Sequence, residues 1–337
     1  MLLLAGSNAL DDAMKLPRRR FLHLASGAAA LPLVSRIAKA DTYPTRSVRI
    51  IVGFPAGNAS DILARLMAQS LSERLGQPFI VENRPGAGGT IGTEAVVRAA
   101  PDGYTLLMEV MTANAINATL YDKLNYDFVR DIAPVAGIGR ASYVMVVNPS
   151  VPARTVPEFI AYAKANPSKV NMASAGNGTA THAFGALFMT LAGVEMVHVP
   201  YRGSFMPDLL GGQVQVVFGP IVQLVDQVRT GKLRALAVTA TTRQALLPDL
   251  PTVAESLPGY EATVWYGMGA PKKTPAEIIE KLNIEVTAAL AGEAMKMRFA
   301  ELACTPTPAT SVEFGKFTAA EIEKWAMVIR AANIKPD

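Results

Sequence analysis

Two sequence patterns alternate along this chain and limit the folds that are open to it. Short runs of apolar and β-branched residues, such as VRIIVGF at 48–54, precede stretches with apolar residues at helical spacing, such as SDILARLMAQSLSERLG at 60–76. The alternation continues through FIVEN at 79–83, TEAVVRAA at 93–100 and YTLLMEV at 104–110. Because parallel strands need a crossover between them, this order predicts a parallel α/β sheet with right-handed crossovers.

The alternation breaks at the Pro- and Gly-bearing stretch RDIAPVAGIG at 130–139 and then starts again. The second series has five strand-like runs (143–148, 170–176, 196–203, 214–221 and 233–240) around helical patterns at 156–167 and 182–193 and a short helix after 203. A late strand-like segment and two long helical segments follow, and they are too small to form a domain of their own. We therefore predict two lobes, 41–142 plus 261–337 and 143–260, with two crossings that allow a cleft to open and close about a hinge.

Length and charge narrow the class further. A chain of 337 residues that is half apolar favours two packed domains. The net charge of +4 comes entirely from the first forty residues, and the remaining 297 carry 26 basic and 26 acidic side chains without a like-charge cluster. We therefore expect no nucleic-acid partner.

Residues 1–40 have the features of an export leader. The stretch RRRFLHLASGAAALPLVSRIAKA at 18–40 has a basic start, a short apolar run and small residues at the −3 and −1 positions of a cleavage site. We expect cleavage near Ala40–Asp41. The arginines at 18–20, followed by Phe21 and Leu22, also fit the twin-arginine pattern, so the Tat and Sec routes both stay open. A start codon assigned too early would explain residues 1–13.

One short motif occurs twice. SAGNGTATH at 174–182 repeats the centre of GFPAGNASD at 53–61. Each copy lies where a predicted strand ends and a predicted helix begins, which is the ligand-binding edge of an open α/β sheet. Glycine allows close approach to a ligand, and the first turn of a helix presents unpaired N–H groups to an anion. Two copies suit an anion with two ends, although ordinary turns capped by Ser60 or Thr179 are the open alternative.

The sequence offers little for catalysis or for a cofactor. Outside the leader the only histidines are His182 and His198, and there is no GxSxG or HExxH motif. The glycine-rich stretch at 83–92 fails the dinucleotide pattern because Ile91 stands where a glycine is needed. The single cysteine, Cys304, can form neither an intrachain disulfide nor a cysteine-based metal site, and we expect it to be buried. We predict no enzymatic activity, no cofactor and no metal.

Six motifs in order carry a family resemblance: VGFPAGNASD, VENRPGAGGTIG, ASAGNGTATH, HVPYRG, DLLGGQVQ and WYGMGAP. Together they resemble the periplasmic solute receptors of tripartite tricarboxylate transporters, also called Bug proteins, over essentially the whole mature chain. The resemblance implies a periplasmic-binding-protein-like (Venus flytrap) fold, with two α/β lobes of mostly parallel sheets around a ligand cleft. It also implies that a carboxylate is held largely by backbone amides and small polar side chains rather than by arginines.

The resemblance assigns ligand-binding positions in both lobes. In the first-lobe loop these are Phe54, Ala56, Asn58, Ser60 and Asp61. In the second they are Ala175, Gly176, Asn177, Gly178, Thr179 and His182, while Tyr201, Arg202, Trp265 and Tyr266 would border the cleft. Three residues depart from the family pattern: Asn58 replaces a common glycine, Ala186 a glutamate and Gln215 an aspartate. We expect Asn58 to alter the ligand contact and the other two to affect packing or helix surfaces.

The function implied by the resemblance is that of a periplasmic receptor. It would bind a small organic acid (a mono-, di- or tricarboxylate) as a monomer and deliver it to the inner-membrane permease subunits of a tripartite transporter. Two alternatives stay open: a ligand sensor for a signalling partner, and an exported hydrolase, for which the sequence lacks a nucleophile-base set. The sequence does not identify the acid.

Overall fold

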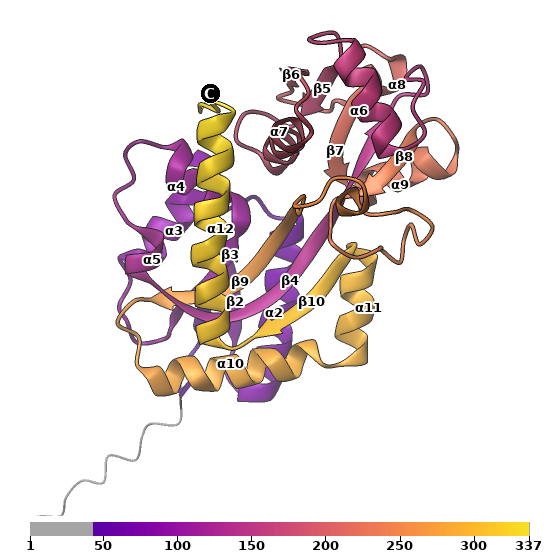
Figure 1. The fold of residues 1–337 in the computed structure, drawn as a ribbon. Helices are drawn as coiled ribbons and strands as arrows, with labels where there is room; N and C mark the ends of the chain where they lie inside the picture. The colour runs from indigo at the N-terminus through magenta and orange to yellow at the C-terminus, as the bar shows by residue number, and fades with distance from the viewer. Residues whose placement is uncertain (1–42, 337) are drawn as a thin grey trace, which may run out of the picture. The chain divides into compact units, whose positions relative to one another are not determined.

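The computed structural model describes residues 43–336, of which residues from Pro44 onward belong to one compact unit. Its strands form one sheet in the order β2-β1-β3-β9-β4-β7-β5-β6, with β8 and β10 also paired to β4 (Figure 1). The strands are β1 (Val48–Val52), β2 (Phe79–Asn83), β3 (Thr105–Val110), β4 (Ile132–Val147), β5 (Asn171–Ser174), β6 (Val197–Pro200), β7 (Val216–Pro220), β8 (Arg234–Val238), β9 (Thr263–Pro271) and β10 (Cys304–Ala309). The predicted export leader lies outside the described residues.

Helices connect and cover these strands (Figure 1). They are α2 (Ala59–Leu75), α3 (Thr90–Val97), α4 (Asn117–Leu120), α5 (Phe128–Asp131), α6 (Val156–Ala165), α7 (Ala180–Ala192), α8 (Met206–Gly211), α9 (Ile221–Arg229), α10 (Ala276–Leu290), α11 (Glu293–Glu301) and α12 (Ser311–Ala331). Short 3₁₀ turns η1 (Ala87–Gly89) and η3 (Val253–Glu255) and a π-type turn η2 (Thr112–Ile116) complete the chain. None of the helices in residues 43–336 is long and apolar enough to cross a membrane.

Local sequence signals explain where the helices begin and end. Asn58 caps the first turn of α2, and Gly76 ends that helix in the left-handed conformation with φ 71°. Thr310 and Glu313 form a capping box at the start of α12. The apolar faces of these helices are buried, as the periodicity predicts: Leu63, Met67 and Leu71 of α2 have no solvent exposure.

The predicted parallel pairing holds in the two outer parts of the sheet. β1 pairs parallel with β2 and β3, and β5 pairs parallel with β6 and β7. The middle of the sheet differs from the expectation of mostly parallel strands, because β9 and β4 pair antiparallel with their neighbours. The reason is topological: these strands carry the chain from one half of the sheet to the other, so no crossover helix returns them to a parallel direction.

The stretch that the sequence analysis treated as a break, 130–139, lies mostly within the longest strand. β4 runs without interruption from Ile132 to Val147 and changes partners along its length. Its residues up to Ser142 pair with β9, and those from Tyr143 onward pair with β7. Glycine is needed here for close packing: a Cβ at Gly137 would lie 2.6 Å from the backbone oxygen of Thr307, and one at Gly139 would lie 2.8 Å from the Phe299 ring.

Two elements near the C-terminus were not foreseen. α11 and β10 lie between the two predicted long helices, and β10 pairs antiparallel with β4. Cys304 at the start of β10 is buried, as expected, and burial raises the pKa of its thiol to about 12. The thiol is therefore an apolar packing group at neutral pH.

Candidate functional site

A cavity of about 550 Å³ lies where the two halves of the sheet meet. Its walls come from the β1–α2 loop, the first turn of α7, strands β4 and β9, and the first turn of α9. The carboxyl ends of parallel strands β1 and β5 lead directly into two of these walls. This is the edge at which open α/β sheets bind ligands.

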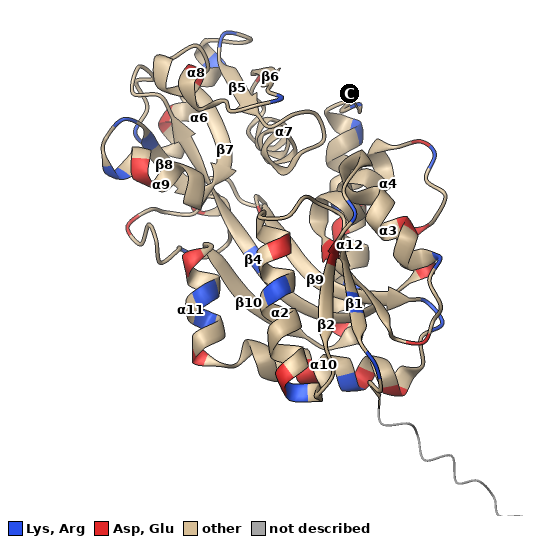
Figure 2. Cartoon of the chain, turned by 180° about the vertical axis from the view of Figure 1, so that it is seen from behind, with Lys and Arg blue, Asp and Glu red and all other residues tan. Residues whose placement is uncertain are grey.

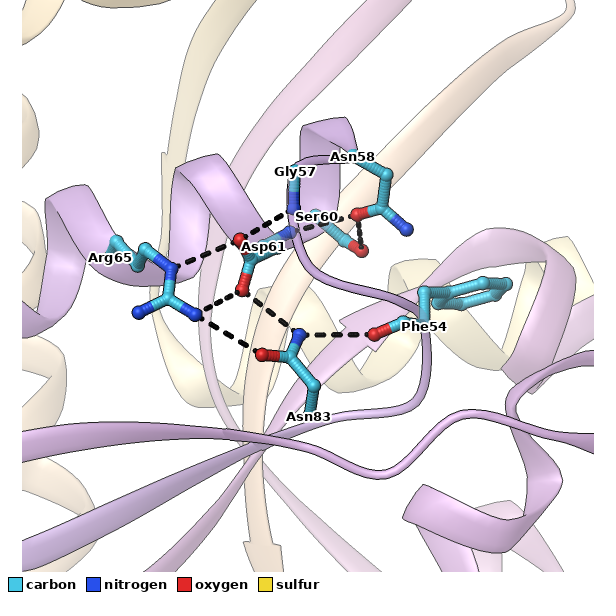
Figure 3. A network of polar contacts seen from close by, with 7 residues as sticks. All are labelled: Phe54, Gly57, Asn58, Ser60, Asp61, Arg65 and Asn83. Carbon is cyan, nitrogen blue, oxygen red and sulfur yellow. Dashed lines mark hydrogen bonds and ion pairs between the residues drawn. The ribbon is translucent and has the colours of Figure 1, made fainter.

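The β1–α2 loop is held by a network of polar contacts, shown in Figure 3. Asn58 Oδ1 accepts hydrogen bonds from the Asp61 N–H at 3.0 Å and from Ser60 Oγ at 2.7 Å. The Asp61 carboxylate accepts the Gly57 N–H at 2.9 Å and forms an ion pair with the exposed side chain of Arg65. The loop is thus fixed in place before any ligand arrives.

Asn83 extends this network from the end of β2. Its amide donates to the Phe54 carbonyl at 3.0 Å and to Asp61 Oδ1 at 2.9 Å, while its oxygen accepts from Arg65 at 3.1 Å (Figure 3). Burial alone would raise the pKa of Asp61, but the hydrogen bonds from Arg65, Gly57 and Asn83 outweigh it and leave that pKa below its usual value. Sequence analysis missed Asn83, because its partners lie more than 15 residues away.

The β5–α7 loop is built differently. Thr179, the N-cap of α7, accepts no bond from the first turn. Its hydroxyl instead donates to the Gly176 carbonyl at 2.7 Å, and Thr181 accepts the Ala175 N–H at 2.8 Å. The first turn of α7 therefore has no capping side chain among the described residues, and Ala180 of that turn lines the cavity. Such N–H groups, with the positive end of the helix dipole, favour an anion.

His182 holds the β5–α7 loop in place through a hydrogen bond and a ring stack. Its Nδ1 accepts the Gly178 N–H at 3.4 Å, and its ring stacks on His198 at 3.5 Å between centroids. Burial, together with the nearby His198, lowers the pKa of His182 to about 3, so the ring is neutral. His198 Nε2 in turn lies 2.6 Å from Ser174 Oγ, but Ser174 is completely buried and is not part of the cavity wall.

The repeated motif aligns Asn58 with Asn177, but in the structure Asn58 corresponds to Thr179, two residues later. Gly57 and Gly178 both have positive φ, at 85° and 68°, and each precedes the N-cap residue. Each donates its N–H to the side chain four residues later, Asp61 or His182. The structural counterpart of Asn58-Ala59-Ser60-Asp61 is therefore Thr179-Ala180-Thr181-His182, not the stretch that starts at the second Ala-Gly-Asn.

About half of the predicted binding residues line the cavity. Those that do are Phe54, Asn58, Ser60, Asn177, Gly178, Thr179 and Tyr266. Those that do not are Ala56, Asp61, Ala175, Gly176, His182, Tyr201, Arg202 and Trp265. In the second group, Asp61 and His182 hold the loops that carry the first group.

Three residues expected to border the cleft lie elsewhere. Trp265 is buried on the other face of β9, where its indole N–H donates to Glu321 of α12 at 3.1 Å. Since strand side chains alternate, Tyr266 and Val264 face the cavity instead. Tyr201 donates its hydroxyl to Asp208 at 2.6 Å, and Arg202 is exposed on the loop that follows β6.

The three departures from the family pattern have different surroundings. Asn58 lines the cavity and caps α2, so it lies where a ligand contact can change. Ala186 is buried within α7. Gln215 accepts the Asn171 N–H and donates to the Gly212 carbonyl, which is a packing role within the second half of the sheet.

The cavity also contains polar residues that sequence analysis did not single out, including Thr112, Asn117, Ser142, Tyr143 and Gln223. No charged side chain of the described residues lines it. Arg65 and Arg84 are engaged in ion pairs, Arg65 with Asp61 and Arg84 with Glu82. In Figure 2 the charged residues gather on outer helices such as α10 and α11. The described residues also contain no group of His, Cys, Asp or Glu that could hold a metal ion.

Comparison with known proteins identifies the family. The family model described as "Tripartite tricarboxylate transporter family receptor" matches residues 63–334. The chain belongs to this family. BugT of Bordetella pertussis is 38% identical to it over 300 residues, which cover 88% of this chain and 92% of that protein. The resemblance found in the sequence motifs is therefore confirmed, and this receptor family is periplasmic and binds solutes.

Solved structures of similar proteins confirm the fold of this receptor. An R. palustris protein with adipate is 35% identical, with a TM-score of 0.75 over 88% of this chain and 100% of that one. The periplasmic binding protein BugD is 33% identical, with a TM-score of 0.71 over 88% and 100%. MatC from Rhodopseudomonas palustris with bound malate is 32% identical, with a TM-score of 0.71 over 85% and 100%. The predicted binding-protein fold is thus correct.

Proposed function

We propose that this receptor binds a small organic carboxylate in the 550 Å³ cavity and delivers it to the permease subunits of a tripartite transporter. The observation that carries the proposal is that the N-termini of α2 and α7 open into one cavity that no described charged side chain lines. A carboxylate there would be held by the backbone N–H groups at the starts of these two helices. The adipate and malate in similar receptors support this class of ligand.

We also propose that the two halves of the sheet act as two lobes, 41–142 plus 261–337 and 143–260. The partner change in β4 between Ser142 and Tyr143 supports a boundary at this point. Because the cavity has walls from both halves, closure of one lobe on the other would enclose the ligand.

The binding proposal is tested by thermal unfolding against a panel of mono-, di- and tricarboxylates and aromatic acids. A ligand at about 100 times its dissociation constant adds roughly 2.7 kcal/mol to the free energy of unfolding. We expect at least one acid to raise the melting temperature, and mass spectrometry of copurifying small molecules to find an acid. A panel without any shift would contradict the proposal, and turnover of an acid would favour an enzyme.

The predicted export and cleavage of the leader can be tested separately from ligand binding. We expect periplasmic protein to begin at or near Asp41, so its intact mass should lack residues 1–40. Recovery of the full leader on periplasmic protein would refute this prediction. Changing Arg18 and Arg19 to lysine should trap the precursor if the route is Tat, whereas continued export would favour Sec.

A further inference from the structure

A second cavity lies within the second half of the sheet, apart from the ligand cavity. It has a volume of about 680 Å³ and is lined by the end of α9, the start of β8 and the loop 245–250. No described residue lines both cavities. α9 extends between them, because residues 221–223 border the ligand cavity while Val228 and Arg229 border the second one. A partner at the second cavity would therefore contact a helix of the ligand site without obstructing the ligand.

Two arginines line this second cavity, and neither forms an ion pair within residues 43–336. Arg229 Nη2 donates to the Leu246 carbonyl at 3.4 Å, which is long for a hydrogen bond. Arg234 Nη1 donates to the carbonyls of Val151 and Ala153 at 2.9 and 3.0 Å. Carbonyl oxygens hold these side chains in place, but they do not balance a full positive charge. Both guanidinium groups are therefore suited to a carboxylate from outside the chain.

The other charged groups near this cavity leave it positive. Lys232, between the two arginines in sequence, is exposed and forms no ion pair with a described residue. Asp249 is the one acidic side chain among the described residues of the wall, and Asp226 of α9 lies outside it. Arg243 is balanced by Glu255 at 3.3 Å. Figure 2 shows basic positions where α9 meets β8. The excess positive charge attracts an acidic partner.

Much of the remaining wall is apolar. Three leucines of the loop, Leu246, Leu247 and Leu250, pack against the core of this half and stay partly exposed. Val228 and Ala235 extend the same surface. A concave apolar surface beside arginines without a counter-ion fits a projecting apolar side chain that has an acidic residue next to it.

Shape and charge favour a protein over a lipid surface at this cavity. A bilayer surface is nearly flat and does not fill a cavity of about 680 Å³. Recognition of anionic lipids typically uses clusters of about four to eight basic residues, whereas Arg229, Lys232 and Arg234 are the basic residues here. A protein segment can supply both a side chain for the cavity and carboxylates for the arginines.

We propose that the permease of the transporter docks at this second cavity, which we call the docking cavity. The contact is a segment of the permease's periplasmic face that carries an acidic residue beside an apolar one. Arg229, Lys232 and Arg234 attract the acidic residue, and the leucines of the loop receive the apolar one. This inference rests on the proposed function, because the permease is the partner to which the receptor would deliver its acid.

The experiment measures binding of the mature receptor to its tripartite permease in nanodiscs by surface plasmon resonance, with and without the acid found in the unfolding panel. Charge reversal in the double variant Arg229→Glu/Lys232→Glu should lower the affinity about tenfold or more, since like charges would then face each other. Its affinity should also depend less steeply on salt than that of the wild type. Leu247→Ser should lower the affinity about threefold or more with the wild-type salt dependence. Arg229→Lys should keep most of the affinity.

The matched control is the double variant Lys164→Glu/Lys169→Glu. It makes the same change in charge at two exposed positions of the same half that line neither cavity. It should bind the permease within about threefold of the wild type. Calorimetry with the acid should give the wild-type affinity for every variant, because the docking cavity shares no described residue with the ligand cavity. Thermal unfolding would check that each variant is folded.

Three outcomes would overturn the docking proposal while the proposed function stands. The first is wild-type permease binding by the folded Arg229→Glu/Lys232→Glu variant, and the second is an equal loss in the control. The third is equal binding of the receptor to permease-free nanodiscs with anionic lipid, which would assign the basic residues to the membrane surface. If the wild-type receptor does not bind the permease with or without acid, the proposed delivery fails and the docking proposal fails with it.

Discussion

Asp61 and His182 occupy the same position in their two loops, but they hold those loops with different chemistry. Each is the third residue of a helix and accepts the N–H of the glycine four residues before it. Asp61 does so as a carboxylate, balanced by Arg65 and Asn83. His182 does so as a neutral ring in a buried stack. The two loops should therefore respond to pH in different ranges.

Asp61→Asn should lower the free energy of unfolding by about 1–3 kcal/mol at pH 7, because Gly57 and Arg65 lose a charged acceptor. The pKa of Asp61 is depressed in the folded state. Its contribution is therefore fully present above the unfolded pKa of about 3.9 and is lost as the pH falls through the folded pKa. Denaturant titrations at several pH values should show the wild-type advantage shrinking below about pH 4. Asp102→Asn, at an exposed ion pair with Arg46, is the control and should cost less than about 1 kcal/mol.

His182→Asn should reduce the acid sensitivity of the receptor between pH 7 and pH 5. The folded pKa of His182 is about 3, well below the unfolded value near 6.5. The unfolded state therefore binds more protons as the pH falls below about 6.5, and wild-type stability drops by up to about 1.4 kcal/mol per pH unit. The asparagine cannot take up this proton but can still accept the Gly178 N–H. Equal pH slopes in the two proteins over this range would show that His182 does not carry the effect.

At the level of elements, two strand–loop–helix units provide the central part of the site. In each, a parallel strand ends, a glycine with positive φ turns the chain, and a helix starts at the cavity. Glycine is required at position 178 for two reasons. Its φ is 68°, and a Cβ there would lie 2.3 Å from Leu120, another residue of the cavity wall. The second unit therefore packs against α4 of the other half of the sheet.

Gly178→Ala should destabilise the receptor and weaken binding of its acid, whereas Gly193→Ala at the opposite end of α7 should do only the first. Both glycines have positive φ, 68° and 59°, and a left-handed alanine costs about 1–2 kcal/mol at either site. At Gly193 nothing lies within 4 Å of the added Cβ, while at Gly178 it displaces Leu120 into the cavity wall. Calorimetry with an acid from the panel would compare the two variants. Unchanged affinity in a folded Gly178→Ala protein would contradict a ligand site at this turn.

At the scale of the whole described unit, the two halves of the sheet are joined by more than the two crossing strands. The Trp325 ring of α12 stacks on Phe184 of α7 at 5.4 Å between centroids. Trp265 and Trp325 both donate to Glu321, so α12 is tied to β9 at the same place. A movement of α7 relative to α12 would therefore disturb the surroundings of Trp325.

If ligand binding closes the proposed lobes, the fluorescence of Trp325 should report it. In a Trp265→Phe variant Trp325 is the only tryptophan, and its emission should change with acid concentration at the dissociation constant found by calorimetry. The reciprocal Trp325→Phe variant should give a smaller change, because Trp265 lies within the β9–α12 packing of one half. A saturated Trp265→Phe protein with unchanged emission would indicate that α7 and α12 do not move relative to each other.

Much of the fold could be predicted from the sequence, because the signals involved are local. Apolar spacing placed α2, α7 and α12 and the strands β1, β3, β7 and β9, since each pattern repeats within one element. The family motifs led to the correct receptor family and fold. The site residues among 54–61 and 174–182 stay a prediction, although both stretches reach the cavity because each directly follows the end of a parallel strand.

Pairing between distant segments decided the rest. The Pro and Gly residues of 132–139 indicate a break when read locally, yet close packing against β9 and β10 makes them part of β4. Trp265 and Tyr266 are adjacent in sequence, and only the direction in which β9 packs on α12 sends one to Glu321 and the other to the cavity. Tyr143 and the start of α9 became site elements through the β4–β7 ladder. A single sequence encodes spacing along the chain, whereas the side of a sheet that faces a ligand depends on contacts between residues more than fifty positions apart.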